Sequence, residues 1–388
     1  VRLGYVSRGI RVLDQYINGL GVDGGCDEGP TYWGAAAGSV YDALNLLYDA
    51  TGGKLNIYGE PFVQKMASYI YKTHIAGKYF INVADAHPEF VPDGLMLFRF
   101  GSSMKDTLMM QFGSWSKLAG EQVFIDIFHR TRVLYNLTGF TACAAYPARE
   151  PVLPNVWLSD VQLMAARSAG GFFVASHGGN NGESHNHNDV GDFMVYADGY
   201  PLIIDVGSGT YTSRTFSKDR YRLWFNTSPF HNLPTIHDNQ QGAGSKFAAS
   251  EVKYDKGRLT MNIAAAYPAA AGVTLWQRNV GIGKGNTVLV EDHYKGTTLF
   301  SHITQSLMTV GEPGIDDPGK IVFTLPDNSK VFLDYDPKLW SASKEKMTLT
   351  TPEEQGLKTS WEGKDIWRIL LTGRQDKNEV RTKYIIHK

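Results

Sequence analysis

The sequence has few cysteines, almost no net charge and no long apolar run. Its two cysteines, Cys26 and Cys143, stand far apart without the spacing of metal-ligand pairs, which argues against a disulfide framework and a thiolate metal site. The formal net charge is −1, so no global positive field attracts nucleic acid, an anionic membrane or an acidic polysaccharide. An anionic substrate must therefore meet a local patch. No stretch approaches the roughly 20 apolar residues of a membrane span.

The order of patterns predicts two domains in this chain of 388 residues. Up to about residue 150, apolar residues recur at three- and four-residue spacing, which is typical of α-helices. Prolines between Pro147 and Pro154 mark a boundary. Beyond it, short alternating or β-branched runs between turn signals favour antiparallel strands. We therefore predict an α+β protein, with a helical domain at 1–150 and an antiparallel β-sandwich at 151–388.

The densest polar cluster is Ser184-His185-Asn186-His187-Asn188-Asp189, with glycines on both sides. In an extended segment His185 and His187 project to the same face, so two imidazoles can address one site. Asp205 ends an apolar strand, where a buried carboxylate needs a partner, and His231 lies in a proline-containing loop. Two histidines and one aspartate can form a zinc site. The alternative is a hydrogen-bonded polar loop.

The zinc hypothesis has a geometric requirement. If residues 198 and 199 form a tight hairpin turn, Asp205 lies opposite Asp192 on the next strand. A straight strand would then leave His187 roughly 16 Å farther along. The histidine loop must therefore curl back, which its glycines and asparagines permit.

A second cluster, residues 23–34, can hold the hydroxyl of Tyr32 and the indole of Trp33 at a cleft. Tyrosine needs a nearby cation or hydrogen-bond donors to act as an acid or base, because its unperturbed pKa is about 10. The alternative is that Tyr32 and Trp33 pack at a helix N-terminus, where Glu28 interacts favourably with the helix dipole.

A third stretch, residues 218–224, combines three cations with two aromatic residues just before His231. Arg220 can bind a carboxylate or sulfate, and Trp224 can stack against a sugar face. A solvated surface strand is the alternative.

Residues 184–191, 199–208 and 230–232 resemble, in order and spacing, the successive signatures of heparinase II/III-like polysaccharide lyases. Residues 28–33 are similar to the tyrosine-bearing loop of the helical toroid in that family. The resemblance implies a partial (α/α) toroid followed by an antiparallel β-sandwich. It implies Tyr32 and His185 as catalytic residues, and His187, Asp205 and His231 as ligands of one structural divalent metal ion, zinc.

The resemblance also implies β-elimination of a uronic-acid-containing glycan, in the periplasm or outside the cell. Heparin or heparan sulfate is the favoured substrate, and an alginate oligosaccharide exolyase is the nearest alternative. Glu28, Trp33, Arg220 and Trp224 are expected to bind this acidic polysaccharide or oligosaccharide. An acid and a base must flank one sugar ring, so we expect the Tyr32 hydroxyl and the His185 imidazole to face one cleft.

The sequence departs from the family pattern in one respect. The Asn or His that neutralises the substrate carboxylate stands farther ahead of the tyrosine than the 31 residues that precede Tyr32 here. We therefore expect that residue on an N-terminal helical segment missing from this chain. Two other classes stay open: a non-catalytic glycan-binding β-sandwich, if Tyr32 is remote from His185, and a metal-dependent hydrolase, if the metal holds an exchangeable water.

Overall fold

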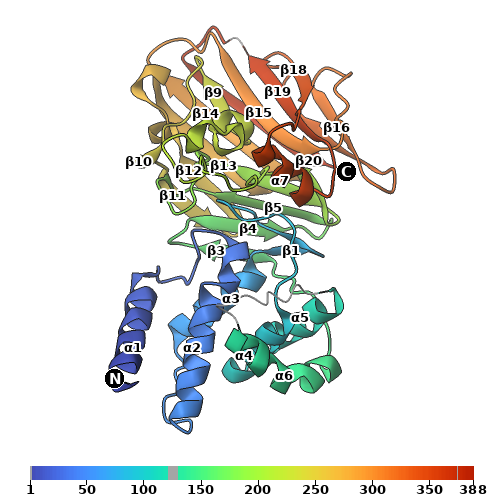
Figure 1. Cartoon of the computed structure of the whole chain (residues 1–388). Coiled ribbons are helices and arrows are strands. Elements are labelled where there is room, and N and C mark those ends of the chain that lie inside the picture. Colours follow the sequence, from blue (N-terminus) through green and yellow to red (C-terminus); the bar gives the residue numbers. More distant parts are fainter. Residues whose placement is uncertain (1, 121–129, 374) are drawn as a thin grey trace. The chain divides into compact units, whose positions relative to one another are not determined.

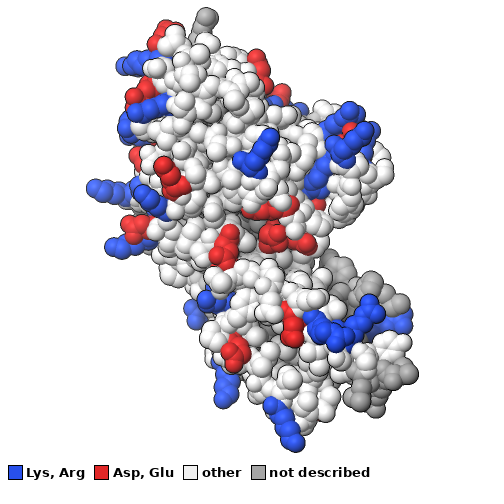
Figure 2. All heavy atoms as spheres, turned by 90° about the vertical axis from the view of Figure 1, so that its left-hand side faces the viewer, with Lys and Arg blue, Asp and Glu red and all other residues white. Residues whose placement is uncertain are grey.

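The chain folds into two compact units in a computed structural model that describes residues 2–120, 130–373 and 375–388 (Figure 1). The first unit comprises the residues up to Phe80 and those from Phe90 to Val152, and the second comprises Ile81–Glu89 and Leu153–Lys388. None of the described helices is long and apolar enough to cross a membrane. Figure 2 shows basic and acidic side chains scattered together over the visible face, in line with the near-zero net charge.

Helices build the first unit, as its apolar spacing predicts. They are α1 (Arg2–Gly19), α2 (Ala37–Ala50), α3 (Pro61–Lys72), α4 (Gly94–Met104), α5 (Thr107–Leu118) and α6 (Arg130–Ala145), with the short strands β1 (His74–Ala76) and β2 (Tyr79–Phe80) after α3. Asp93 caps α4 by accepting a hydrogen bond from Met96 N at 2.9 Å. α4 and α5 pack closely because Gly113 has no side chain: a Cβ there would lie 2.5 Å from Phe98 N.

Antiparallel sheets build the second unit. A five-stranded sheet has the order β3 (Asn155–Leu158), β4 (Leu163–Arg167), β5 (Phe172–His177), β7 (Phe193–Ala197), β8 (Tyr200–Ile203). A seven-stranded sheet has the order β11 (Ser250–Asp255), β12 (Arg258–Asn262), β13 (Val273–Ile282), β14 (Val288–Gly296), β20 (Glu379–His387), β17 (Lys330–Asp334), β16 (Lys320–Thr324). A four-stranded sheet has the order β18 (Ser341–Lys346), β19 (Ile366–Gly373), β15 (Ile303–Val310), β9 (Pro234–Ile236), and β10 (Gly244–Ala248) pairs with β6 (Asn180–Asn181).

One apolar core joins the three larger sheets. It includes Val174 of β5, Trp276 of β13, Tyr294 of β14 and Leu307 of β15, all with 1% exposure or less. Trp276 and Tyr294 stack with ring centroids 4.2 Å apart. Their inward positions follow the alternation of strands, which turns every second residue toward the core. This packing holds the strand ends that carry the polar loops described below.

A buried ion pair lies at the edge of this core. Arg278 of β13 contacts Asp292 of β14 at 2.7 Å, and both side chains are fully buried. The same guanidinium donates to the backbone oxygens of Gly191 at 3.1 Å and Asn232 at 2.8 Å. It therefore fixes two loops from separate parts of the chain beside each other.

The segment 81–89 belongs to the second unit, whereas the sequence analysis counted it with the helical residues 1–150. Asn82 donates to the backbone oxygen of Asp205 at 2.9 Å, and Ser208 donates to the backbone oxygen of Asp85 at 2.9 Å. Such long-range hydrogen bonds leave no periodic signal in a sequence, and this explains the difference.

Candidate functional site

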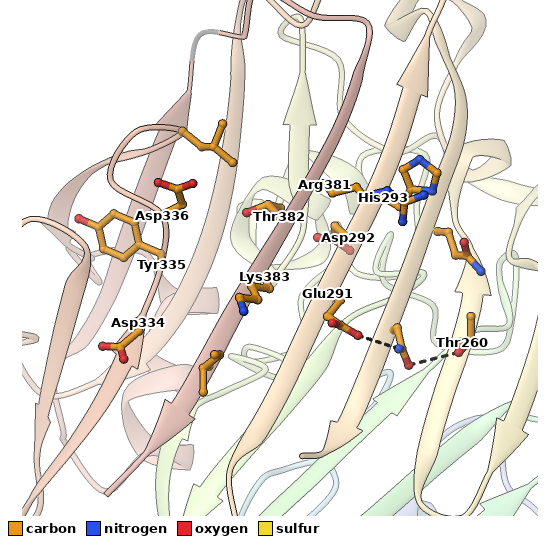
Figure 3. A pocket seen from close by; sticks show the side chains of 14 residues that line it. Thr260, Glu291, Asp292, His293, Asp334, Tyr335, Asp336, Arg381, Thr382 and Lys383 are labelled. Carbon is orange, nitrogen blue, oxygen red and sulfur yellow. Dashed lines mark hydrogen bonds between the residues drawn. The ribbon is translucent and has the colours of Figure 1, made fainter. Parts of the chain in front are cut away.

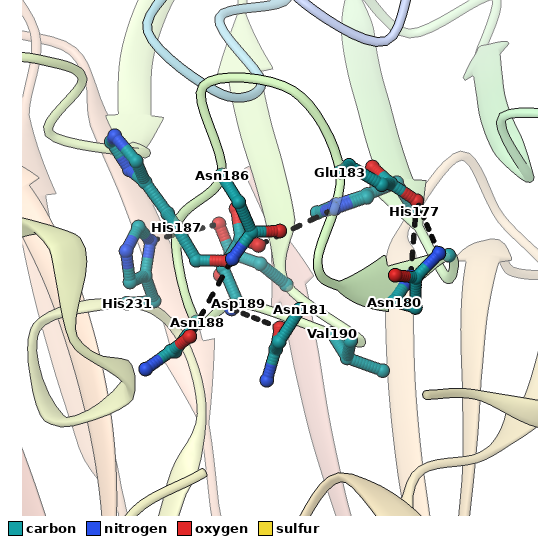
Figure 4. Close-up of polar contacts among 12 residues, drawn as sticks. His177, Asn180, Asn181, Glu183, Asn186, His187, Asn188, Asp189, Val190 and His231 are labelled. Carbon is teal, nitrogen blue, oxygen red and sulfur yellow. Dashed lines mark hydrogen bonds and ion pairs between the residues drawn. The ribbon is translucent and has the colours of Figure 1, made fainter. Parts of the chain in front are cut away.

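The histidine loop, residues 182–192, connects β6 to β7 and curls back as the zinc hypothesis requires (Figure 4). Gly191 has a φ of 88°, which a glycine adopts without steric cost. A Cβ at that position would lie 2.7 Å from Ile263 Cγ2. Asp189 N donates to Asn181 Oδ1 at 3.2 Å, and Val190 N donates to Gln241 Oε1 at 3.0 Å. The loop is therefore held by the protein around it.

The curl brings the predicted metal ligands together. One candidate ligand atom from each of His187, Asp189, Asp205 and His231 lies within 4.8 Å of the others, and all four residues are buried. His187 and His231 come from separate segments, with ring centroids 5.4 Å apart (Figure 4). The structure thus groups the three residues proposed from the sequence and adds Asp189, which the sequence analysis did not select as a ligand.

The donor set fits a metal ion. Among the described residues, His187 Nδ1, Asp189 Oδ2, Asp205 Oδ2 and both ring nitrogens of His231 are buried without a hydrogen-bond partner. Asp205 Oδ2 approaches His231 Nδ1 to 3.2 Å. Buried polar atoms without partners are costly, and a divalent cation compensates nitrogens and carboxylates at once. Two histidines and two carboxylates are a donor set that can hold one divalent metal ion.

Neighbouring groups orient these side chains. Gly207 N donates to Asp205 Oδ1 at 2.7 Å, which leaves Oδ2 turned toward the other ligands. His177 Nε2 lies 3.5 Å from Asp189 Oδ1. Burial lowers the pKa of His177, but the charge of Asp189 outweighs it and raises that pKa to about 9. His177 therefore lies beside the oxygen of Asp189 that is turned away from the unpartnered Oδ2.

His185, the predicted catalytic histidine, lies at the more exposed end of the loop, with 22% of its side chain exposed. Its Nδ1 is 3.0 Å from Asp85 Oδ2 and 3.0 Å from the hydroxyl of Tyr211, which itself donates to Asp85 Oδ2 at 2.9 Å. The ring of Phe216 lies edge-on at 5.8 Å between centroids. Tyr211 and Phe216 are 41% and 67% exposed, so an aromatic surface adjoins the imidazole.

Asp85 is a residue that the sequence analysis missed. Its Oδ1 lies 3.0 Å from His187 Nε2 and 2.8 Å from Arg220 Nη2. Its Oδ2 makes the hydrogen-bond contacts with His185 and Tyr211 described above. Burial acts to raise the pKa of Asp85, but hydrogen bonds and charge from His187 and Arg220 outweigh it and hold that pKa well below its usual range. The signal in the sequence is slight: one carboxylate within a short run of small residues.

Arg220 has intramolecular partners for four of its five N–H donors. Nε donates to Asn186 O at 2.9 Å, Nη1 to Thr215 O at 3.2 Å, and Nη2 to both His185 O at 2.7 Å and Asp85 Oδ1. Its exposure is 9%. These contacts stabilise the histidine loop, and the substrate-binding role assigned to Arg220 stays a prediction.

The stretch around Arg220 is not a surface strand. It forms the short 3-10 helices η2 (Arg220–Arg222) and η3 (Trp224–Asn226). Trp224 is half-buried, and its indole nitrogen donates to Glu354 Oε1 at 2.8 Å. Its ring packs against Phe230, with centroids 4.9 Å apart. Trp224 therefore has packing partners of its own, and its predicted contact with a sugar stays a prediction.

The tyrosine loop lies in the first unit. Tyr32 is half-buried within the 3-10 helix η1 (Pro30–Gly34), and Glu28 just before it is half-buried. Trp33 is 1% exposed and donates to Met66 O at 3.0 Å. Trp33 thus packs as the alternative interpretation expected. Burial raises the pKa of the Cys26 thiol to about 12, which keeps it protonated. The shared cleft for Tyr32 and His185 stays a prediction.

The outer face of the seven-stranded sheet is hollowed into a second feature (Figure 3). This cavity of about 680 Å³ is lined by polar side chains, including Asn279, Glu291, His293, Arg381 and Lys383. Residues predicted for catalysis, substrate binding or metal binding are absent from its described lining. It is therefore separate from the histidine loop.

Comparison with known proteins identifies the part of the chain that carries the histidine loop. Residues 162–313 match the family model described as Heparinase II/III-like, C-terminal. This segment is similar to the C-terminal domain of heparinase II/III-like proteins. The matched segment contains His185 and all four members of the metal-ligand group, whereas Asp85 and Tyr32 lie outside the matched residues. The resemblance stated from the sequence is confirmed. No curated protein matches the chain.

Solved structures share the fold over nearly the whole chain. Heparan sulfate lyase HepC from Pedobacter heparinus is 15% identical with a TM-score of 0.69, and the match covers 98% of this chain and 55% of that one. The heparinase III-BT4657 gene product gives 15% identity, a TM-score of 0.70 and the same coverage. A Paenibacillus xanthan lyase gives 9% identity, a TM-score of 0.51 and coverage of 92% and 38%. At these identities the likeness shows the fold alone. The chain spans about half the length of the first two.

Proposed function

We propose that this chain is part of a polysaccharide lyase that cleaves a uronic-acid-containing glycan by β-elimination. The observation that carries the proposal is His185. It lies at the exposed end of the metal-ligand loop within the matched segment, with its Nδ1 on the buried carboxylate Asp85. A histidine oriented by a carboxylate through one nitrogen can transfer a proton through the other.

The proposed reaction uses two proton-transfer groups. One removes the C5 proton of the uronate, a C4–C5 double bond forms, the C4–O bond breaks, and the second group protonates the departing oxygen. His185 takes one step and Tyr32 the other, by the resemblance of their loops to the family signatures. The phenol of Tyr32 and the imidazole of His185 then exchange protonation states in each turnover.

The metal group supports the site without joining the reaction. We propose that His187, Asp189, Asp205 and His231 hold one zinc ion. The ion supplies a structural crosslink between the histidine loop and the segments that carry Asp205 and His231. The burial of all four residues supports this role, because a catalytic metal needs an open position for water or substrate.

The same proposal extends to architecture and substrate. We assign the helices of the first unit to the C-terminal part of an (α/α) toroid and the sheets of the second to a β-sandwich. Heparan sulfate is the favoured substrate, because a protein of the same fold is named a heparan sulfate lyase. The residue that neutralises the substrate carboxylate is assigned to a preceding helical segment, since solved heparinase III chains are nearly twice as long as the match.

The experiment compares heparan sulfate and alginate oligosaccharides as substrates of the zinc-loaded protein, both as residues 1–388 and within any longer natural chain. The expected product of heparan sulfate has an unsaturated uronate, seen by its ultraviolet absorbance and by mass. Turnover of alginate oligosaccharides without turnover of heparan sulfate would show that alginate, not heparan sulfate, is the substrate. A saturated product carrying added water would contradict elimination and favour a hydrolase. Binding of either glycan without turnover by any form of the protein would favour a non-catalytic module.

A further inference from the structure

We propose that Asp85 is a positioning residue that fixes the proton-transfer histidine and a metal ligand with one carboxylate. This inference deepens the proposed function and rests on it for the role of His185. Nothing in the family match covers Asp85, which lies 100 positions before His185 and outside the matched residues.

The geometry divides the two oxygens of Asp85 between two tasks. Oδ1 lies within hydrogen-bond distance of His187 Nε2, at 3.0 Å, and accepts a hydrogen bond from Arg220 Nη2 at 2.8 Å. Oδ2 lies within hydrogen-bond distance of His185 Nδ1, at 3.0 Å, and accepts a hydrogen bond from the Tyr211 hydroxyl at 2.9 Å. An ionised carboxylate only accepts hydrogen bonds, so both imidazoles must donate to it. Asp85 therefore determines the tautomer of both rings.

Each tautomer has a consequence. With its proton on Nε2, His187 presents the lone pair of Nδ1, a buried atom that lacks a hydrogen-bond partner in the described part of the chain, and His187 is a member of the metal-ligand group. With its proton on Nδ1, His185 carries its lone pair on Nε2. The first arrangement suits metal binding, where a carboxylate commonly orients the ligand histidine. The second leaves Nε2 as the nitrogen that can exchange a proton with a substrate.

Burial and a backbone hydrogen bond hold Asp85 in a fixed position. Its side chain is 1% exposed, and its backbone oxygen accepts from Ser208 Oγ at 2.9 Å. His185, in contrast, has a φ of 54°, a left-handed conformation that is sterically unfavourable for a residue other than glycine. The histidine loop therefore depends on contacts from outside itself to hold that conformation. Asp85 provides such a contact, and Arg220 joins it to the backbone of His185 at 2.7 Å.

The test replaces Asp85 by asparagine, which has a similar shape but presents one acceptor oxygen and one donor group. Because His185 and His187 contact different oxygens of Asp85, an asparagine cannot replace both contacts, and it provides no negative charge for either. The matched control is Glu89→Gln, which makes the same chemical change in the same segment at a residue whose ion-pair partner is Lys364, 3.7 Å away. A second variant, Tyr211→Phe, removes the hydroxyl and keeps the carboxylate.

The first readout is the tautomer of His185, measured by nitrogen NMR on protein labelled in histidine at alkaline pH, with the signal assigned through His185→Gln. We expect the proton on Nδ1 in the wild type, in Glu89→Gln and in Tyr211→Phe, and loss of that preference in Asp85→Asn. A wild-type ring protonated on Nε2 would overturn the proposal, even if Asp85→Asn failed to fold. An unchanged tautomer in folded Asp85→Asn would also overturn it.

The second readout is zinc affinity, measured by competition with a chelator. Loss of an outer carboxylate partner weakens metal binding or activity roughly 10- to 100-fold. We expect a loss of that size in Asp85→Asn and an unchanged affinity in Glu89→Gln and Tyr211→Phe. Equal affinities in all four proteins would overturn the link to His187.

Neither readout needs a substrate, so the proposed function and this inference can fail separately. A protein without lyase activity that shows both effects would retain the positioning of both histidines by Asp85 and lose the proposed function, and with it the proton-transfer role of His185. An active lyase that shows neither would retain the function and lose the inference. Where activity is present, Asp85→Asn should lower kcat with little change in KM, because the carboxylate orients His185 and does not contact substrate.

Discussion

The proton transfer that we propose for Tyr32 depends on its hydroxyl group. Tyr32→Phe keeps the ring in its half-buried place in η1 but removes the proton. We expect kcat to fall by at least about 100-fold while KM changes little, since general acid–base groups contribute roughly 10²- to 10⁴-fold. Steady-state kinetics of unsaturated-product formation provide the measurement. The control is Tyr135→Phe, which removes a hydroxyl of the same unit that donates to Asp49 at 2.7 Å. Near-normal turnover in Tyr32→Phe would exclude the role.

Phe216 is an exposed aromatic residue beside the catalytic candidate. Its ring lies 5.8 Å from that of His185 and 5.0 Å from that of Tyr211, and 67% of it is exposed. Such a ring suits the apolar face of a sugar. We expect Phe216→Ala to raise KM about 2- to 13-fold, the equivalent of the 0.5–1.5 kcal/mol that aromatic contacts contribute. Leu299→Ala, at another exposed apolar residue of the second unit, should leave KM unchanged. Equal effects of the two variants would contradict a specific contact.

At the scale of elements, α7 (Pro352–Ser360) supports the loop that carries Tyr211 and Phe216. Thr210 N donates to Glu353 O at 2.8 Å, and the helix starts with a capping box between Thr351 and Glu354. Gly356 permits this approach, because a Cβ there would lie 2.2 Å from Thr210 N. The loop therefore takes its shape from a helix more than a hundred positions away.

The close approach of Gly356 to Thr210 reverses the usual effect of a glycine-to-alanine substitution in a helix. Glycine to alanine inside a helix normally stabilises it by about 1 kcal/mol. We expect Gly356→Ala instead to lower the midpoint of thermal unfolding and to speed amide hydrogen exchange at residues 209–212. Gly9→Ala in α1, where a Cβ meets nothing within 4 Å, should be neutral or stabilising. A Gly356→Ala protein as stable as the wild type, with unchanged exchange, would show that the loop adapts without cost.

At the scale of the whole molecule, a metal ion held by His187, Asp189, Asp205 and His231 would link folding to ligand binding. A ligand that binds only the folded state stabilises it, by about 2.7 kcal/mol at 100 times its Kd. We expect chelation to lower the midpoint of thermal unfolding together with activity, and added zinc to restore both. His231→Ala should melt at a lower temperature and respond little to the chelator. Loss of activity at an unchanged midpoint would instead indicate a metal that takes part in the reaction.

Part of the site was predictable because its residues stand in polar motifs that lack the apolar periodicity of buried helices and strands. His185, His187 and His231 stand in polar, glycine- or proline-containing segments, and Asp205 ends an apolar strand. The sequence does not reveal which way each side chain turns. Asp189 belongs to the same polar motif as His187, yet its inward orientation depends on the curl of the loop. Trp33 shows the reverse: it stands in a functional motif but packs in the core.

Local pattern by itself determined the helical first part, the β-rich second part and the residues that can bind a metal, because periodicity and side-chain chemistry are properties of neighbours in the chain. Tertiary structure alone decided that Asp85 lies between His185 and His187, that Asp189 completes the ligand group and that Arg220 stabilises the histidine loop. These contacts join segments far apart in the chain. They depend on how the sheets pack and where the loops close, and no short stretch of sequence specifies either.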